Sequence, residues 1–171
     1  MNPHAKGLVD IGELVLKFAK VNRVTFHEDG ERYESDTDHT VMLSVCACAL
    51  AEAVYKNTLD VGKVAQFAII HDLVEVYAGD TNTINISEDE RRIKELKEKE
   101  SLETIIKKFG DVYPWIHSTI LEYESLASKE AQFVKVLDKA MSKITNTLNK
   151  GAALKALGTS EAEITKHFKN Q

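Results

Sequence analysis

The sequence contains little cysteine, proline or tryptophan. Its 171 residues include two cysteines, two prolines and one tryptophan. Cys46 and Cys48 are two positions apart, so on a helix their side chains point about 200° from each other. At that angle they can neither form a disulfide nor chelate a metal together. We therefore expect both to be small, buried, apolar residues.

The sequence also lacks a long apolar run and a linker. Residues 1–7 have no apolar core of the kind found in signal peptides, and no apolar run approaches the roughly 20 residues that span a bilayer. The eight glycines are scattered, and Pro3 and Pro114 are far apart. We expect one domain over residues 1–171, in the cytoplasm and without a membrane partner.

Positive charge is not in excess. The chain has 27 acidic and 22 basic residues, which gives a net charge of −5. Binding to a nucleic acid backbone draws its affinity from clustered lysine and arginine, so we expect no nucleic acid partner. A small phosphorylated substrate is compatible with this charge if a metal ion and one or two local cations make the electrostatic potential inside a pocket positive.

Helical periodicity dominates the sequence. Apolar residues recur three and four positions apart, and this pattern predicts an all-α bundle of about six to seven helices, with no strand pattern of useful length. Residues 22–36 break the pattern and are expected to form a loop, with a short hairpin around residues 28–31. The expected helices cover residues 8–21, 38–55, 61–77, 87–109, 114–124 and 128–150, and a short last helix is capped by Ser160.

The expected helices differ in polarity. The one over residues 38–55, capped by Asp36 or Thr37, is small and apolar on all sides, which is typical of a helix surrounded by others. The helix that starts at residue 87 is crowded with charge, and Glu90 and Lys94 lie one turn apart on it. We interpret that charged stretch as a face exposed to solvent.

His71 and Asp72 provide the strongest indication of chemistry. They lie in an apolar helix, where an ionised carboxylate costs several kcal/mol unless a cation compensates it. Adjacent helical residues diverge by about 100°, so the pair can hold one ion between them. Glu75 follows one turn later, near the same face.

Two further residues could complete a metal site. His39 opens the preceding helix, and Asp138 lies within an apolar stretch of a later one. Taken singly, either could be a buried polar residue with ordinary hydrogen-bond partners. Together with His71 and Asp72 they form a mixed nitrogen and oxygen set that suits a divalent ion: Mn²⁺, Co²⁺, Fe²⁺, Ni²⁺, Zn²⁺ or Mg²⁺.

The order of these residues resembles that of the HD-domain superfamily of metal-dependent phosphohydrolases, in which a histidine is followed by an HD pair and a distant aspartate. The resemblance is specific to the 5'-deoxynucleotidase-like branch and covers residues 8–141. Three segments carry it: ESDTDH at residues 34–39, HDLVEVYAGD at residues 71–80, and the run of EYE at 122–124, EA at 130–131, Lys135 and DK at 138–139.

The resemblance implies a function and roles for single residues. Such proteins are often homodimers that remove phosphate from deoxynucleoside 5'-monophosphates, a small-molecule nucleotide substrate. It implies that His39, His71, Asp72 and Asp138 bind the metal. Glu75 and Asp80 would be catalytic, activating water or delivering a proton, and Arg23 would bind the phosphate. The branch often has tryptophan after this arginine, whereas this chain has Val24.

Several alternatives stay open. The same site in related enzymes releases triphosphate from deoxynucleoside triphosphates or cleaves other nucleotides. A protein of another class would be a non-catalytic module that binds a metal or a nucleotide. Glu75 could also be a hydrogen-bond partner of His71, and Asp80 a turn residue beside Gly79. Base and sugar preference do not follow from the sequence.

Overall fold

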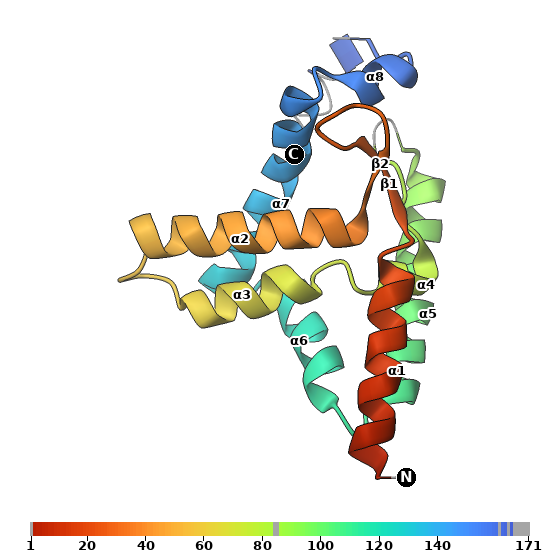
Figure 1. Cartoon of the computed structure of the whole chain (residues 1–171), viewed down its shortest axis with the longest axis vertical. Helices are drawn as coiled ribbons and strands as arrows, with labels where there is room; N and C mark the ends of the chain where they lie inside the picture. The colour runs from red at the N-terminus through yellow and green to blue at the C-terminus, as the bar shows by residue number, and fades with distance from the viewer. Residues whose placement is uncertain (1, 84–85, 161, 164, 166–171) are drawn as a thin grey trace.

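The protein is a helical bundle with one small hairpin (Figure 1). The computed structural model describes residues 2–83, 86–160, 162, 163 and 165. The predicted all-α class is confirmed. The elements in the described residues are α1 (Pro3–Phe18), β1 (Asn22–Phe26), β2 (Tyr33–Ser35), α2 (Asp36–Val54), α3 (Val61–Ile70), α4 (Glu75–Ala78), α5 (Glu88–Phe109), α6 (Pro114–Glu124), α7 (Lys129–Leu148) and α8 (Ala152–Ala156).

The helices enclose two apolar clusters. The first joins α2, α3, α6 and α7 around Leu43, Phe67 and Val134. The second joins α1, α5 and α6 to the segment after α3, around Leu14, Ile105 and Ile120. The chain passes from one cluster to the other at the end of α3, because Ala68 belongs to the first and Ile70 to the second. Residues 71 and 72 therefore lie where the two clusters meet.

Helix α1 begins earlier than its apolar pattern predicts. Asn2 caps it by accepting a hydrogen bond from the backbone of His4, and Pro3 occupies the first helical position, where a missing N–H costs nothing. Leu14 and Phe18 are buried as expected, but Leu8 is 66% exposed. Only a short apolar face of α1, at its C-terminal end, packs against the second cluster.

A hairpin connects α1 to α2. β1 and β2 are antiparallel, with Asn22 opposite Ser35 and Phe26 opposite Tyr33. The expected turn therefore exists, and the strands beside it extend the hairpin beyond residues 28–31. The hairpin packs against α7 and α8, where the Asn149 side chain donates a hydrogen bond to the carbonyl of Phe26 at 2.7 Å.

Helix α2 is capped by Ser35, not by Asp36 or Thr37. The Ser35 hydroxyl accepts from the backbone of Asp38, whose carboxylate accepts in return from the backbone of Ser35. This capping box places Asp36 inside the helix, where its side chain is buried.

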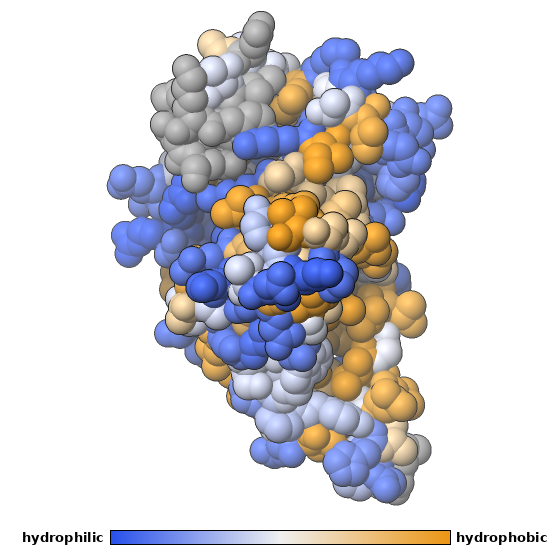
Figure 2. Space-filling model, turned by 90° about the vertical axis from the view of Figure 1, so that its left-hand side faces the viewer, coloured by the Kyte–Doolittle hydropathy of each residue, from blue (hydrophilic) through white to orange (hydrophobic). Residues whose placement is uncertain are grey.

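The prediction that α2 is surrounded on all sides is wrong. It packs on α3 and α7, but Val41 is 57% and Val45 64% exposed. Figure 2 shows apolar patches between charged groups on the face where α2 ends and α3 begins. Among the described helices, α2 is also the one with the length and hydropathy of a membrane span, a weak criterion that core helices also meet.

The helix expected over residues 61–77 is divided in two. α3 ends at Ile70 and α4 begins at Glu75. Between them the hydrogen bonds join residues three apart, from Leu73 to Ile70 and from Glu75 to Asp72, which tightens the chain into turns. Gly79 then ends α4 with a positive φ of 76°, a conformation that glycine adopts without strain.

The remaining helices follow the sequence prediction. α5 starts after Ser87, which forms the expected capping box with Glu90, and α6 and α7 lie where their apolar periodicity places them. The predicted cap at Ser160 is present, because its hydroxyl accepts from the backbone of Glu163. α8 was not predicted, since its five residues are too short for a periodic pattern.

Candidate metal centre and active site

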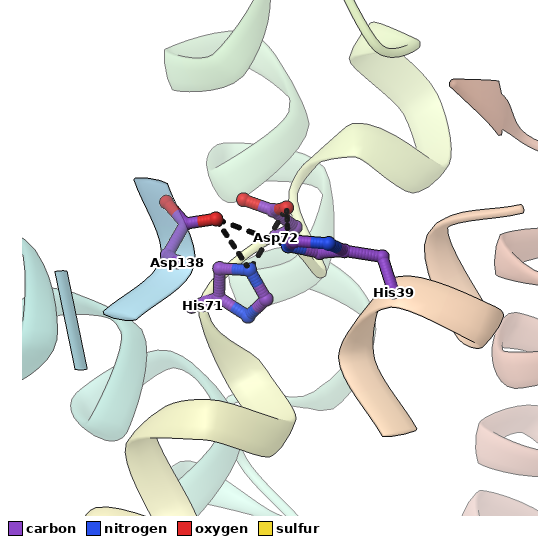
Figure 3. A group of neighbouring side chains, drawn as sticks. All are labelled: His39, His71, Asp72 and Asp138. Atoms are coloured by element: carbon purple, nitrogen blue, oxygen red, sulfur yellow. Dashed lines mark hydrogen bonds and ion pairs between the residues drawn. The ribbon is translucent and has the colours of Figure 1, made fainter. Parts of the chain in front are cut away.

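Four predicted ligands meet at one point (Figure 3). His39 comes from the first turns of α2, His71 and Asp72 from the turn after α3, and Asp138 from the middle of α7. One ligand atom from each residue lies within 4.8 Å of the others. Both imidazoles are buried, whereas the Asp72 and Asp138 side chains are 18% and 15% exposed. The site is therefore closed behind and open on its carboxylate side.

The distances within this group suit a divalent cation. The Nε2 atom of His71 lies 2.9 Å from Oδ2 of Asp72, and Nε2 of His39 lies 3.0 Å from Oδ1 of Asp138. The two longer distances, from His39 to Asp72 and from His71 to Asp138, are 3.8 and 3.7 Å. Ligand atoms about 2.1 Å from a common centre are about 3 Å apart at right angles.

The hydrogen bonds of His71 prepare it as a ligand. Its Nδ1 lies 2.9 Å from the carbonyl of Ala68, an acceptor, so this nitrogen carries the proton. Nε2 of the neutral ring then has a lone pair, and this buried atom has no hydrogen-bond partner. A lone pair facing two carboxylates is repelled unless a cation lies between them. The residues present thus fit a metal ion.

The pKa values of the ligands reflect the same electrostatics. Burial lowers the pKa of His39. Burial opposes the ionisation of Asp138, but the hydrogen bond with His39 brings its pKa below the usual value. Burial also lowers the pKa of His71, but the charges of Asp72 and Asp138 act more strongly and bring it above the usual value. A metal ion requires both imidazoles to be neutral and both aspartates to be ionised, and a cation at this point would offset the attraction that favours a proton on His71.

Arg23 lies beside the metal ligands. Its Nη1 donates to Oδ2 of Asp72 at 3.0 Å and to Oδ1 of Asp36 at 3.3 Å. Burial opposes its charge, yet Asp72 and Asp80 keep its pKa above the usual value. The structure thus brings the predicted phosphate-binding cation to the edge of the metal centre and leaves its Nε without a hydrogen-bond partner.

Glu75 and Asp80 lie on the same side of the site. Glu75 is 4% exposed, and burial together with the charges of Asp72 and Asp80 raises its pKa to about 11. A divalent cation at the four ligands would oppose this repulsion. Glu75 is not the hydrogen-bond partner of His71, because that proton goes to Ala68.

Asp80 does more than shape the turn after Gly79. Its carboxylate accepts a hydrogen bond from the backbone of Val24, next to Arg23 in β1. Burial raises the pKa of Asp80, and the charge of Arg23 acts in the opposite direction. The hydrogen bond holds the end of the HDLVEVYAGD segment against the strand that carries Arg23.

The third motif segment supports the site from behind. The Tyr123 ring packs edge-on against His71, with centroids 6.2 Å apart. Lys135 places its Nζ 3.7 Å from Asp138, and Glu130 accepts a hydrogen bond from the backbone of Asp60 at the start of α3. These residues orient the ligand-bearing helices.

Sequence reasoning missed two features of the site. The spacing predicts an exposed pair of Lys94 with Glu90, but Glu90 bonds to Ser87. Lys94 instead pairs with Glu98 and faces Glu75. Asp36 was considered as a helix cap and instead bonds Arg23. An acidic residue in an apolar helix, such as Asp36, indicates a buried polar contact and could have been recognised from the sequence. The spacing of Lys94 does not differ from that of the exposed lysines around it.

A further buried acid, Glu34, lies in the hairpin. Glu34 is 3% exposed, and its Oε2 has no hydrogen-bond partner. Burial raises its pKa from the usual 4.5 to about 7, although Arg23 and a hydrogen bond from Thr145 act in the opposite direction. Between those pH values the folded protein keeps a proton that the unfolded chain loses, so stability falls as the pH rises through this window.

We therefore expect Glu34→Gln to stabilise the protein at pH 8. The gain over wild type should reach up to about 3 kcal/mol and become small near pH 4.5, where the folded acid is neutral and the unfolded one is half ionised. Urea unfolding at pH 4.5, 6 and 8 measures it. The exposed Glu31→Gln in the same hairpin is the matched control and should show no such trend. An equal effect of Glu34→Gln at all three pH values would contradict this account.

Comparison with known families agrees with this geometry. A model of the HD domain matches residues 15–171. The chain belongs to the HD-domain family. The resemblance inferred from the ligand order is thereby confirmed, and the matched residues include all four predicted ligands.

Among curated proteins, this HD-domain chain is similar to 5'-deoxynucleotidase HDDC2. It is 26% identical to the Homo sapiens protein over 137 residues, which are 79% of this chain and 64% of that protein. It is 27% identical to the Mus musculus protein over 135 residues, covering 78% and 65% of the two chains. The chain thus spans just under two thirds of the length of these relatives.

Solved structures share the fold. A predicted metal-dependent phosphohydrolase from Magnetospirillum magnetotacticum MS-1 superposes with a TM-score of 0.79 at 25% identity, covering 95% of this chain and 81% of that chain. A conserved hypothetical protein from Pyrococcus furiosus gives a TM-score of 0.63 at 24% identity, covering 90% and 84%. The second likeness concerns the fold alone.

Proposed function

We propose that this protein is a metal-dependent phosphohydrolase that removes phosphate from deoxynucleoside 5'-monophosphates. The observation that carries the proposal is the pairing of a four-ligand cation site with a buried arginine, joined at Asp72. A phosphate ester needs both parts, because its reacting oxygens must be polarised and its other oxygens held. The names of the HDDC2 relatives support the choice of substrate.

Each residue has a role in this proposal. His39, His71, Asp72 and Asp138 would hold the metal, which when bound polarises a phosphoryl oxygen and lowers the pKa of water. Arg23 binds the phosphate through its fork of donors. Its planar group already lies against Asp72, so a phosphate that it binds is next to the metal ligands.

Glu75 and Asp80 would handle protons. Glu75 is buried beside the ligands and takes or orients the proton of the attacking water. Asp80, at the end of the same segment and tied to β1, protonates the leaving 5'-oxygen or holds the sugar. The same geometry would serve if Asp80 acted on the water and Glu75 on the leaving group. We therefore propose that the two residues together act as the general acid and the general base.

A homodimer also belongs to this proposal. Exposed apolar side chains remain on the outer face of α2, at Val41, Val45 and Val54. A second copy of the chain is the partner that the family resemblance implies, and burial of these side chains would supply its driving force.

The substrate can be tested by product analysis. Purified protein with Mn²⁺ or Co²⁺ should release inorganic phosphate from deoxyadenosine 5'-monophosphate, with a kcat/KM at least tenfold higher than for the corresponding triphosphate. Ion chromatography distinguishes phosphate from tripolyphosphate. Release of tripolyphosphate would favour the triphosphohydrolase alternative. No turnover of any phosphate ester, with nucleotides still raising the melting temperature, would favour a non-catalytic binding module.

A further inference from the structure

Lys94 lies at the active site, although it comes from a helix outside the metal motifs. Its side chain is 22% exposed, and its Nζ lies 3.8 Å from Oε1 of Glu75. The Ser101 hydroxyl, on the same helix, donates to the carbonyl of Val74 and fixes α5 against the start of α4. Lys94 therefore faces the proposed proton-transfer carboxylate from a defined position.

The other nearby cations are already bound to the metal ligands. Arg23 contacts Asp36 and Asp72, and Lys135 lies 3.7 Å from Asp138. On the side of Glu75 and Asp80, two carboxylates would face an arriving phosphate ester. On this side, Lys94 is the described cation that forms an ion pair with Glu75. An anionic substrate there needs a positive charge to offset the repulsion.

Lys94 also borders a cavity. A shallow hollow of about 180 Å³ lies next to the site, and besides Lys94 its lining includes Thr81, Asn82, Ile86 and Ile93. Thr81 follows Asp80 directly, so the hollow adjoins the end of the HDLVEVYAGD segment. The rest of the lining is Lys97 and one acid, Glu90. Apolar and amide groups beside two cations are suited to a ligand with an anionic end and a less polar body.

We propose that Lys94 is a substrate-binding residue whose ammonium group donates to a phosphate oxygen of the substrate. In the structure without ligand, Lys94 is paired with Glu98 one turn along α5. Substrate phosphate would replace Glu98 as its partner and would be held between Lys94 and Arg23. This inference rests on the proposed function, because it assigns the phosphate of that reaction.

The charge state of Lys94 agrees with this role. Burial lowers the pKa of Lys94, but the nearby carboxylates of Glu98 and Glu75 raise it by more than that. The pKa of Lys94 is therefore above its usual value. Lys94 therefore stays protonated at neutral pH and can act as a donor throughout the reaction.

The test compares Lys94→Met with Lys99→Met, an exposed lysine on the same helix. Both variants and wild type are loaded with one equivalent of Mn²⁺ and titrated with inorganic phosphate in a calorimeter. Metal content and melting temperature are recorded for each. We expect phosphate to bind at least tenfold more weakly to Lys94→Met, and kcat/KM for the deoxynucleotide to fall at least tenfold, with metal content unchanged. Lys99→Met should equal wild type.

A second variant separates binding from folding. Glu98→Gln removes the competing partner, so phosphate should bind as tightly as to wild type or more tightly. If Glu98→Gln loses phosphate binding to the same extent as Lys94→Met, the pair supports the fold and the proposal is overturned. Phosphate affinity within twofold of wild type in Lys94→Met would also overturn it.

The two proposals fail in different ways. Wild type that binds phosphate but hydrolyses no phosphate ester disproves the proposed function, while the calorimetric comparison still decides whether Lys94 binds the anion. Wild type that hydrolyses the deoxynucleotide, with Lys94→Met unchanged in affinity and kcat/KM, disproves only the role of Lys94.

Discussion

Removal of divalent metal with a chelator will lower phosphate release by at least about a thousandfold. A bound cation contributes several kcal/mol of charge stabilisation in the transition state, and each 1.36 kcal/mol corresponds to a factor of ten in rate. Without it, Nε2 of His71 faces the carboxylates of Asp72 and Asp138 with no cation between them. Activity should return when Mn²⁺ or Co²⁺ is added in stoichiometric amount, as a phosphate release assay would show.

A ligand variant provides the control for this result. Asp138→Asn keeps an oxygen that accepts the hydrogen bond of His39 but removes one negative charge. It should fold, bind metal more weakly by elemental analysis and need more metal for activity. Asp111→Asn, at an exposed position, should behave as wild type. Full activity of the chelated protein, or undiminished metal affinity of Asp138→Asn, would refute the metal centre.

Glu75→Gln will keep the metal and lose most of the turnover. Glutamine occupies the same buried space but cannot accept a proton from water, and positioned general acids and bases contribute about a hundredfold to ten-thousandfold in rate. We expect kcat to fall by about a hundredfold to a thousandfold with little change in KM. Steady-state kinetics and metal analysis of the same preparation measure this.

The exposed Glu95→Gln is the matched control for that variant. It should leave kcat and KM unchanged. If Glu75→Gln instead loses metal, Glu75 supports the ligands rather than the proton transfer. If its turnover equals that of wild type, Glu75 is a scaffold residue, and Asp80 alone must serve the reaction.

Much of the bundle could be predicted from local rules. Helices α6 and α7 lie where apolar periodicity places them, and Ser87 and Ser128 satisfy free backbone amides at the starts of α5 and α7. The ligand set was predictable for a different reason. His71 and Asp72 stand in an apolar stretch, where burial is costly without a cation.

The remaining features depend on contacts between distant segments. No glycine or proline marks the break between Ile70 and Glu75, so periodicity extended one helix across it. The exposure of Val41 and Val45 follows from how many helices pack around α2, which its composition does not reveal. Lys94 approaches Glu75 because α5 lies along α4, a contact that no short-range spacing encodes.

The two strands of the hairpin between α1 and α2 lie between the metal centre and the loop that joins the strands. The rung from Asn22 to Ser35 closes the loop at its base, and Arg23 and His39 follow on the two sides of that rung. The six residues between Phe26 and Tyr33 form the tip and lie at the far end of the ladder. Arg32 at the end of the tip pairs with Asp38 in the first turn of α2. A change in the length of the rest of the tip should therefore leave the spacing between Arg23 and His39 unchanged.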